Sequence, residues 1–281
     1  MKLSIITINR NNAAGLEKTM CSVSTQTCKE FEYVVIDGAS TDGSVEVIKK
    51  LESEFANLKW LSEHDSGIYN AMNKGIRMAT GNYIQILNSG DILASSEVVA
   101  KMFKSLESMS YPDIMYGNMI KDSINGKKVR DKGFAGKIPT MIDFFHGTLN
   151  HDPAYIKRCL FEKYGYYRED LPITADWRWY VEAIPFGGVK PVYVDIDVTV
   201  FDMTGVSETQ IAKREKERDE ELKRILPLGV YQDYKNYHFP IEQWTRIKKI
   251  GVVYKFFYFV ERVIFKFEKR REKRKNQQIN R

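Results

Sequence analysis

The sequence predicts an α/β fold with a mostly parallel central sheet, and its first ninety-five residues carry the supporting pattern. Short apolar runs rich in β-forming residues recur there, segments with helical spacing separate them, and polar residues follow each run. The runs are LSIITI (3–8), YVVI (33–36), LKWL (58–61) and YIQIL (83–87). Strands that alternate with helices imply parallel pairing through crossover helices.

The helices between these runs repeat apolar residues every three or four positions. One stripe consists of Leu16, Met20 and Val23. A clearer helix starts near Gly67 and stops before Gly81, a residue type that commonly follows a helix end. Its apolar positions are Ile68, Met72, Ile76 and Ala79.

The pattern becomes mixed after residue 110. The segments IMYGNMIKD and KKVRDKG on either side of Asn125–Gly126 predict a hairpin, and residues 189–201 predict one or two strands. Residues 208–226 predict a charged helix, and helical spacing returns from about Gln243. We therefore expect one α/β domain over residues 1–205 and a helical extension with a basic tail over residues 206–281.

The positive charge of the chain is local. The net charge is +6, yet nine lysines and arginines and only two glutamates lie between Arg262 and Arg281, so residues 1–261 sum to about −1. A nearly neutral body argues against a general nucleic-acid-binding surface. A basic tail favours one local anionic partner, such as a lipid head-group layer.

The cysteines and the N-terminus indicate a cytoplasmic protein. Cys21, Cys28 and Cys159 form neither a CxxC pair nor a zinc-ligand cluster, which argues against a disulfide framework and favours a reducing compartment. The first residues, MKLSIITINRNN, are too mixed and too short in apolar length for a signal peptide.

Polar residues follow four of the predicted strands. They are Asn9–Arg10, Asp37–Asp42, Glu63–Ser66 and Asn88–Asp91. Taken alone, Asp37–Asp42 is more typical of a turn and helix cap than of a binding loop, and Asn88–Asp91 fits a polar turn as well as a metal-binding loop. Ligands of open parallel sheets, however, bind beyond the carboxyl ends of the strands, so four such loops favour one shared pocket. A cation that also binds phosphate and water needs only one or two carboxylates, and Asp91 could supply one.

Three segments resemble the successive motifs of family 2 glycosyltransferases with the GT-A fold. They are SIITINRNN, EYVVIDGASTDGS and EHDSGIYNAMNKGIRMATGNYIQILNSGD, within residues 2–95. A weaker resemblance continues in LNHDPAYIKRCLFEKYGYY, ITADWRWY and TGVSE. It implies a nucleotide-sugar-binding half over residues 1–95 and an acceptor half over residues 96–205. The Gln-x-x-Arg-Trp motif and the membrane spans of processive members are not found, which favours transfer of one sugar per acceptor.

The resemblance also implies roles for individual residues. The nucleotide-sugar contacts would be Thr7, Asn9, Asp37, Asp65 and Asn88. Asp91 would bind Mn²⁺ or Mg²⁺ across the diphosphate of the donor, which we expect to be a UDP-sugar. Asn88 and Gly90 replace acids found in many relatives, so we expect weak metal binding without the donor nucleotide.

The implied chemistry needs a base on the acceptor side. Asp176 matches the position of the family's general base, and attack opposite the leaving group would invert the anomeric centre. His151 would contact the diphosphate or the acceptor, and Trp177 or Trp179 would line an acceptor sugar. The alternatives are a helix-capping Asp176, a structural His151 and core tryptophans.

The C-terminal stretch predicts an amphipathic helix. Its apolar face consists of Val253, Phe256, Phe257, Val260, Ile264 and Phe267, and basic residues occupy much of the remainder. Charges interrupt the apolar run too early for a spanning helix. Residues 250–275 therefore predict either an interfacial helix on the anionic inner face of the cell membrane, which would suit a lipid-linked oligosaccharide acceptor in surface polysaccharide synthesis, or a helix packed on the catalytic domain.

Two other functions remain open from the residues. A sugar nucleotidyltransferase would need a Gly-rich, basic loop after the first strand, and INRNNAAG is a poor version of one. The reduced metal motif also leaves open a catalytically silent nucleotide-sugar-binding or membrane-associated interaction protein.

Overall fold

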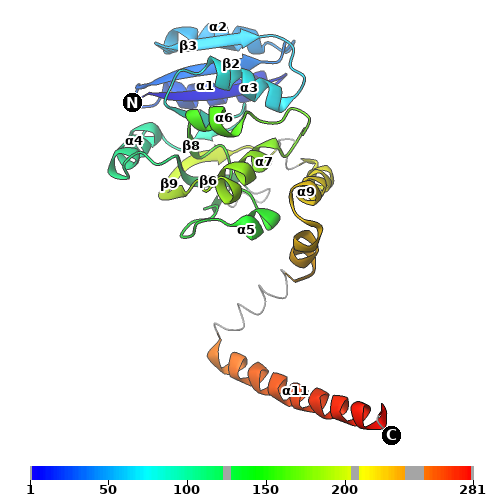
Figure 1. The fold of residues 1–281 in the computed structure, drawn as a ribbon. Helices are drawn as coiled ribbons and strands as arrows, with labels where there is room; N and C mark the ends of the chain where they lie inside the picture. Colours follow the sequence, from blue (N-terminus) through cyan, green and yellow to red (C-terminus); the bar gives the residue numbers. More distant parts are fainter. Residues whose placement is uncertain (1, 123–127, 204–208, 238–249, 280–281) are drawn as a thin grey trace. The chain divides into compact units, whose positions relative to one another are not determined.

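A computed structural model describes residues 2–122, 128–203, 209–237 and 250–279 (Figure 1). The chain divides into two compact units, Met1–Arg224 and Ile225–Arg281. In the described part of the first unit, nine strands form one sheet. The strands are β1 (Leu3–Asn9), β2 (Phe31–Asp37), β3 (Leu58–Ser62), β4 (Tyr83–Ile86), β5 (Ile92–Leu93), β6 (Ile114–Asp122), β7 (Lys128–Asp131), β8 (Ala154–Lys157) and β9 (Pro191–Phe201).

Helices connect and cover these strands. They are α1 (Ala13–Ser24), α2 (Ser44–Leu51), α3 (Ile68–Met78), α4 (Val98–Ser108), α5 (Met141–His146), α6 (Cys159–Tyr164), α7 (Ala175–Val181) and α9 (Ile211–Ile225). A short 3₁₀ turn, η1 (Glu52–Glu54), follows α2, and a π-helical turn, η2 (Glu182–Phe186), follows α7.

The first half of the sheet is parallel, in the order β3-β2-β1-β4. Strands β1 and β2 pair in register from Leu3 opposite Phe31 to Asn9 opposite Asp37. Both strands are buried almost throughout, which is why they appear in the sequence as continuous apolar runs. Parallel pairing brings the loops after β1, β2 and β4 to one edge of the sheet.

The second half of the sheet is mixed. Strand β8 lies antiparallel between β4 and β6, β9 runs parallel to β6, and β5 pairs with the far end of β9. Strands β6 and β7 form the expected hairpin, whose turn lies outside the described residues. Residues 191–201 form the single strand β9. These features confirm the predicted α/β class.

Helices cover both faces of the parallel half. On one face the predicted stripe of α1, Leu16, Met20 and Val23, is fully buried in a core that includes α4. On the other face α3 packs on β1 and β2. A Cβ added at Gly75 would lie only 2.4 Å from Ile6 Cγ2, so the close contact of α3 with the sheet requires glycine.

The second unit contains α11 (Gly251–Ile279). Large apolar side chains are exposed along it, including Phe256, Phe259 and Phe267. None of the helices in the described ranges combines the length and the apolar character needed to cross a membrane.

Candidate active site

A cavity of about 880 Å³ lies at the edge of the sheet where the parallel strands end. Loops after β1 and β4 form one side of it, through Arg10, Asn12, Asn88 and Asp91. The N-terminal half of α3, the segment 146–152 and α7 form the other side, and α9 contributes Arg214 and Arg218. Of the residues predicted from the sequence, Asn88, Asp91, His151, Asp176 and Trp177 line this cavity.

The remaining predicted residues lie near the ends of β1, β2 and β3 without lining the cavity. Asn9 Nδ2 donates to Asp37 Oδ1 at 2.9 Å, and Ser62 Oγ donates to Asp37 Oδ2 at 2.7 Å. Burial alone would raise the pKa of Asp37, but hydrogen bonds from Ser40, Ser62 and Asn9 outweigh it and lower that pKa. Asp37 is therefore held ionised at the end of β2.

Thr7 and Asp65 have different surroundings. Thr7 is completely buried, and its hydroxyl oxygen accepts a hydrogen bond from Tyr33 at 2.9 Å. Asp65 forms an ion pair with Lys74 at 2.7 Å. Its Oδ2 would lie 3.0 Å from a Cβ added at Gly38, so the loops after β2 and β3 meet there.

Asp91 is buried beside two further carboxylates that the sequence did not indicate. Its Oδ1 accepts a 2.7 Å hydrogen bond from the backbone N–H of Asp202, which follows β9. Asp152 lies within hydrogen-bonding reach, and burial together with the Asp152 charge raises the pKa of Asp91 well above its usual range. Gly90 makes room for this arrangement, since its φ is +108° and a Cβ there would lie 2.8 Å from Asp202 Oδ2.

These carboxylates fit a divalent cation that is completed by other ligands. Asp91 and Asp152 are each 2% exposed, and Asp152 Oδ1 is buried without a hydrogen-bond partner, with His151 Nε2 3.5 Å away. A cation beside them would neutralise the paired carboxylates and give Asp152 Oδ1 a direct ligand contact. Within the described ranges, no three acidic, histidine or cysteine side chains converge as a complete metal site. Diphosphate and water oxygens would therefore have to supply most of the coordination.

A chain of hydrogen bonds connects the β4 loop to α7. Asn88 Nδ2 lies 3.1 Å from His151 Nε2, and His151 Nδ1 lies 3.0 Å from Asp176 Oδ2. Burial opposes a charged imidazole, but the carboxylates of Asp152 and Asp176 outweigh it and raise the pKa of His151 to about 9. An imidazolium needs an acceptor at Nε2. Asp152 Oδ1 lies 3.5 Å from this nitrogen, and turning the Asn88 amide over would present a second acceptor, its buried and otherwise unpartnered Oδ1.

Asp176 also contacts Tyr69 on α3. The Tyr69 hydroxyl lies 2.7 Å from Asp176 Oδ1 and 2.7 Å from the carbonyl oxygen of Ile173. It has one proton and can donate to only one of them at a time. Burial would raise the pKa of Asp176, but the bonds from His151 and Tyr69 outweigh it and lower that pKa. Asp176 is thus an ionised carboxylate in the cavity wall.

The two tryptophans of α7 differ in position. Trp177 lines the cavity, donates from Nε1 to the Phe144 carbonyl at 2.8 Å and lies under the Arg218 guanidinium, 5.0 Å from its carbon. Trp179 stacks on Phe161 with ring centroids 4.7 Å apart. Both tryptophans are buried in the core, Trp177 at 2% and Trp179 at 3% exposed, and Trp177 also borders the cavity.

Sequence reasoning missed several residues of this site. They are Tyr69, Asp152, Asp202, Arg214 and Arg218. Asp152 stands next to His151 in the quoted motif and could have been noticed there. Tyr69 also stands in a quoted motif, in the segment GIYNAMNKG, whereas Asp202, Arg214 and Arg218 come from elements that only the fold brings to the cavity.

Comparison with known proteins identifies the family. The family model described as glycosyl transferase family 2 matches residues 4–168. A PGL/p-HBAD biosynthesis glycosyltransferase of Mycobacterium bovis is 24% identical over 87% of this chain and 91% of its own length. An uncharacterized glycosyltransferase of Mycobacterium tuberculosis is 32% identical over 73% of this chain and 76% of its own length.

Solved structures share the fold. The S. aureus TarS structure in complex with UDP-GlcNAc has a TM-score of 0.65 at 18% identity, covering 90% of this chain and 80% of that chain. A longer TarS chain is matched over only 42% of its length. The mannosyltransferase PcManGT from Pyrobaculum calidifontis, in complex with GDP-Man and Mn²⁺, has a TM-score of 0.62 at 18% identity, covering 84% of this chain and 69% of that chain. The chain therefore belongs to glycosyl transferase family 2 and is a glycosyltransferase with the GT-A fold.

Proposed function

We propose that this glycosyltransferase moves one sugar from a UDP-sugar to an acceptor hydroxyl, with inversion at the anomeric carbon. The observation that carries the proposal is one cavity lined by both the buried carboxylate Asp91 and the ionised carboxylate Asp176. The first suits the diphosphate end of a donor, and the second suits the acceptor end.

Asp91 would hold Mn²⁺ or Mg²⁺, with Asp152 as the nearest further carboxylate and with diphosphate and water oxygens completing the coordination. When bound, the cation acts as a Lewis acid that stabilises the charge of the departing nucleoside diphosphate. The nucleoside would lie over the loops that carry Asn9, Asp37 and Asp65. Thr7 is completely buried, so we assign it a structural role in place of a nucleotide contact: its hydroxyl oxygen accepts the hydrogen bond of Tyr33 and connects β1 to β2.

Asp176 would act as the general base. As the acceptor oxygen bonds to the anomeric carbon, the bond from that carbon to the phosphate oxygen breaks, and the acceptor proton moves to Asp176. The Tyr69 proton can turn to the Ile173 carbonyl, which leaves Asp176 Oδ1 available for the acceptor hydroxyl. His151 donates to Oδ2 and keeps the carboxylate ionised and oriented. An α-linked donor would give a β-linked product.

We further propose a lipid-linked oligosaccharide as acceptor, at an anionic membrane surface contacted by residues 250–275, as in surface polysaccharide synthesis on the inner face of the cell membrane. Large apolar side chains of α11, among them Val252, Phe256 and Phe259, are exposed, and a basic run follows them in the sequence. An exposed apolar face with basic residues beside it favours an anionic interface. The acceptor would enter beside Trp177.

Binding and hydrolysis assays test the donor, the metal and the base together. We expect Mn²⁺ and one nucleotide sugar of a panel to raise the melting temperature jointly, because a ligand of the folded state stabilises it. Asp91→Ala should abolish this joint rise in melting temperature. Asp176→Asn should retain the rise in melting temperature but lose hydrolysis of the nucleotide sugar, in which water replaces the acceptor. Asp113→Asn, whose exposed carboxylate pairs with Lys157, serves as control. Full activity of Asp176→Asn would refute the base, and stabilisation of Asp91→Ala by Mn²⁺ would refute the metal ligand.

Vesicle flotation tests the membrane partner. The full chain should float with vesicles containing phosphatidylglycerol and remain unbound to vesicles of phosphatidylcholine alone. Deletion of residues 250–281 should abolish flotation, and equal flotation of the deleted chain would refute the role of this segment.

A further inference from the structure

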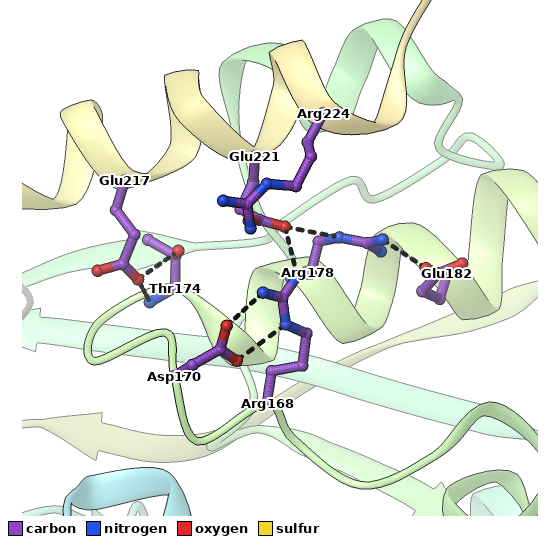
Figure 2. Close-up of polar contacts among 8 residues, drawn as sticks. All are labelled: Arg168, Asp170, Thr174, Arg178, Glu182, Glu217, Glu221 and Arg224. Atoms are coloured by element: carbon purple, nitrogen blue, oxygen red, sulfur yellow. Dashed lines mark hydrogen bonds and ion pairs between the residues drawn. The ribbon is translucent and has the colours of Figure 1, made fainter.

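Helix α9 is attached to the N-terminus of α7 by a carboxylate (Figure 2). Glu217 Oε1 accepts hydrogen bonds from the backbone N–H groups of Ile173 at 3.1 Å and Thr174 at 2.8 Å. It also accepts one from the Thr174 hydroxyl at 2.7 Å. Thr174 is the residue that precedes α7, and its side chain makes no capping bond to its own helix. The hydrogen-bond acceptor at this helix start therefore comes from another element, and it adds a second negative group beside Asp176 in the first turn of α7.

A second carboxylate of α9 holds the middle of α7. Glu221, with a side chain only 2% exposed, accepts from Arg178 Nε at 3.2 Å and from Arg168 Nη1 at 2.8 Å. Arg178 also pairs with Glu182, and Arg168 pairs with Asp170 (Figure 2). Glu217 and Glu221 are four residues apart and thus lie on one face of α9. This face, which we call the α9 clamp, contacts α7 at two successive turns.

The α9 clamp fixes the part of α7 that carries Asp176. Helix α7 has seven residues, and helices this short gain most of their stability from tertiary contacts. Asp176 lies in its first turn, two residues after Thr174. Its partners Tyr69 and His151 belong to other elements, so both contacts require α7 to start at a defined place.

We propose that Glu217 is a positioning residue for the base, so that α9, although part of the predicted C-terminal extension, belongs to the catalytic machinery. The inference rests on the proposed role of Asp176. Glu217 lies outside the set of residues that line the cavity and acts through α7. Loss of its three hydrogen bonds lets the first turn of α7 shift and moves the Asp176 carboxylate relative to Tyr69 and His151. The donor loops after β1, β2 and β4 make none of these contacts.

The test compares Glu217→Ala and Glu217→Gln in the full chain, with Glu220→Ala as a matched control. Glu220 is exposed on the same helix and pairs only weakly with Lys216 at 3.9 Å. Activity is followed as release of nucleoside diphosphate from the donor that the panel selects, at saturating Mn²⁺. We expect Glu217→Ala to lower kcat by about 10- to 100-fold, the loss typical of a misplaced catalytic group, with an unchanged KM for the donor. Glu217→Gln retains a carbonyl acceptor and should recover most of kcat.

A stability-matched variant separates positioning from unfolding. Ile48→Ala removes a fully buried side chain of the α1–α2 core, remote from α7, and should lower the melting temperature without lowering kcat. The positioning role is refuted if Glu217→Ala keeps full kcat, or if Glu217→Gln loses as much as Glu217→Ala. Full activity of Asp176→Asn would instead refute the proposed base, whatever the Glu217 variants do.

Discussion

Glu32 holds the edge of the sheet that lies opposite the active site, at the start of β2. Its side chain is fully buried and accepts hydrogen bonds from Ser4 Oγ at 2.6 Å, Thr80 Oγ1 at 2.8 Å and the backbone N–H of Gly81 at 3.1 Å. Lys59 forms an ion pair with it at 2.9 Å. One carboxylate thus joins β1, β2, β3 and the turn before β4.

The lowered pKa of Glu32 measures how strongly this network stabilises the folded chain. Burial alone would raise its pKa, but the bonds from Ser4, Thr80 and Lys59 outweigh burial and lower the pKa from 4.5 to about 2. Such a difference between the unfolded and folded chain corresponds to about 3 kcal/mol of folding free energy. Because the folded pKa is depressed, this contribution is present above pH 4.5 and is lost as the pH falls towards 2.

Denaturant titrations of the unaltered chain and Glu32→Gln measure this contribution. We expect Glu32→Gln to reduce the free energy of unfolding by about 3 kcal/mol at pH 7, and by progressively less below pH 4.5. Glu30→Gln, which changes an exposed carboxylate two residues earlier, should have little effect at either pH. Sugar transfer by folded Glu32→Gln should be normal. A difference between Glu32→Gln and the unaltered chain that does not depend on pH would refute the reasoning.

Three other substitutions follow from the packing. Gly75→Ala should lower the free energy of unfolding by about 1–3 kcal/mol, because the added Cβ meets Ile6, and urea titration would measure it. Trp179→Ala should lower the free energy of unfolding by about 3–5 kcal/mol, because the buried stacking on Phe161 is lost. The KM for the donor should be unchanged in the folded fraction, and a raised KM would instead show that Trp179 takes part in donor binding. Tyr69→Phe should raise the pKa of Asp176, because the carboxylate loses one hydrogen-bond donor, and so move the acidic limb of the pH profile of kcat to higher pH; an unchanged profile would show that the hydroxyl donates to the Ile173 carbonyl alone.

The parallel half of the fold could be predicted because its signals are local. Strands β1 and β2 are buried on both faces and are therefore continuous apolar runs in the sequence. The stripe through Leu16, Met20 and Val23 marks the buried face of α1. The order of the second half could not be predicted. The position of β8 between β4 and β6 depends on pairing between segments far apart in the chain.

The placement of some residues at the candidate site was predictable for the same reason. Asp91 and Asp176 stand in recognisable motifs directly after a strand and at a helix start. Asp202 reaches Asp91 from 111 residues later, and a local pattern carries no sign of that contact. Glu217 could not be predicted from the sequence for another reason. On a helix with many charges, one glutamate that caps a neighbouring helix has the same sequence signature as those that face solvent.

The attachment of α9 bears on how this protein should be shortened for crystallisation or expression. A version ending near residue 205 would retain all nine described strands and every predicted donor contact. It would lose the carboxylates that hold α7, together with Arg214 and Arg218 from the cavity wall. We expect such a fragment to bind nucleotide and transfer poorly, so a truncation intended to remain active should extend at least through Arg224.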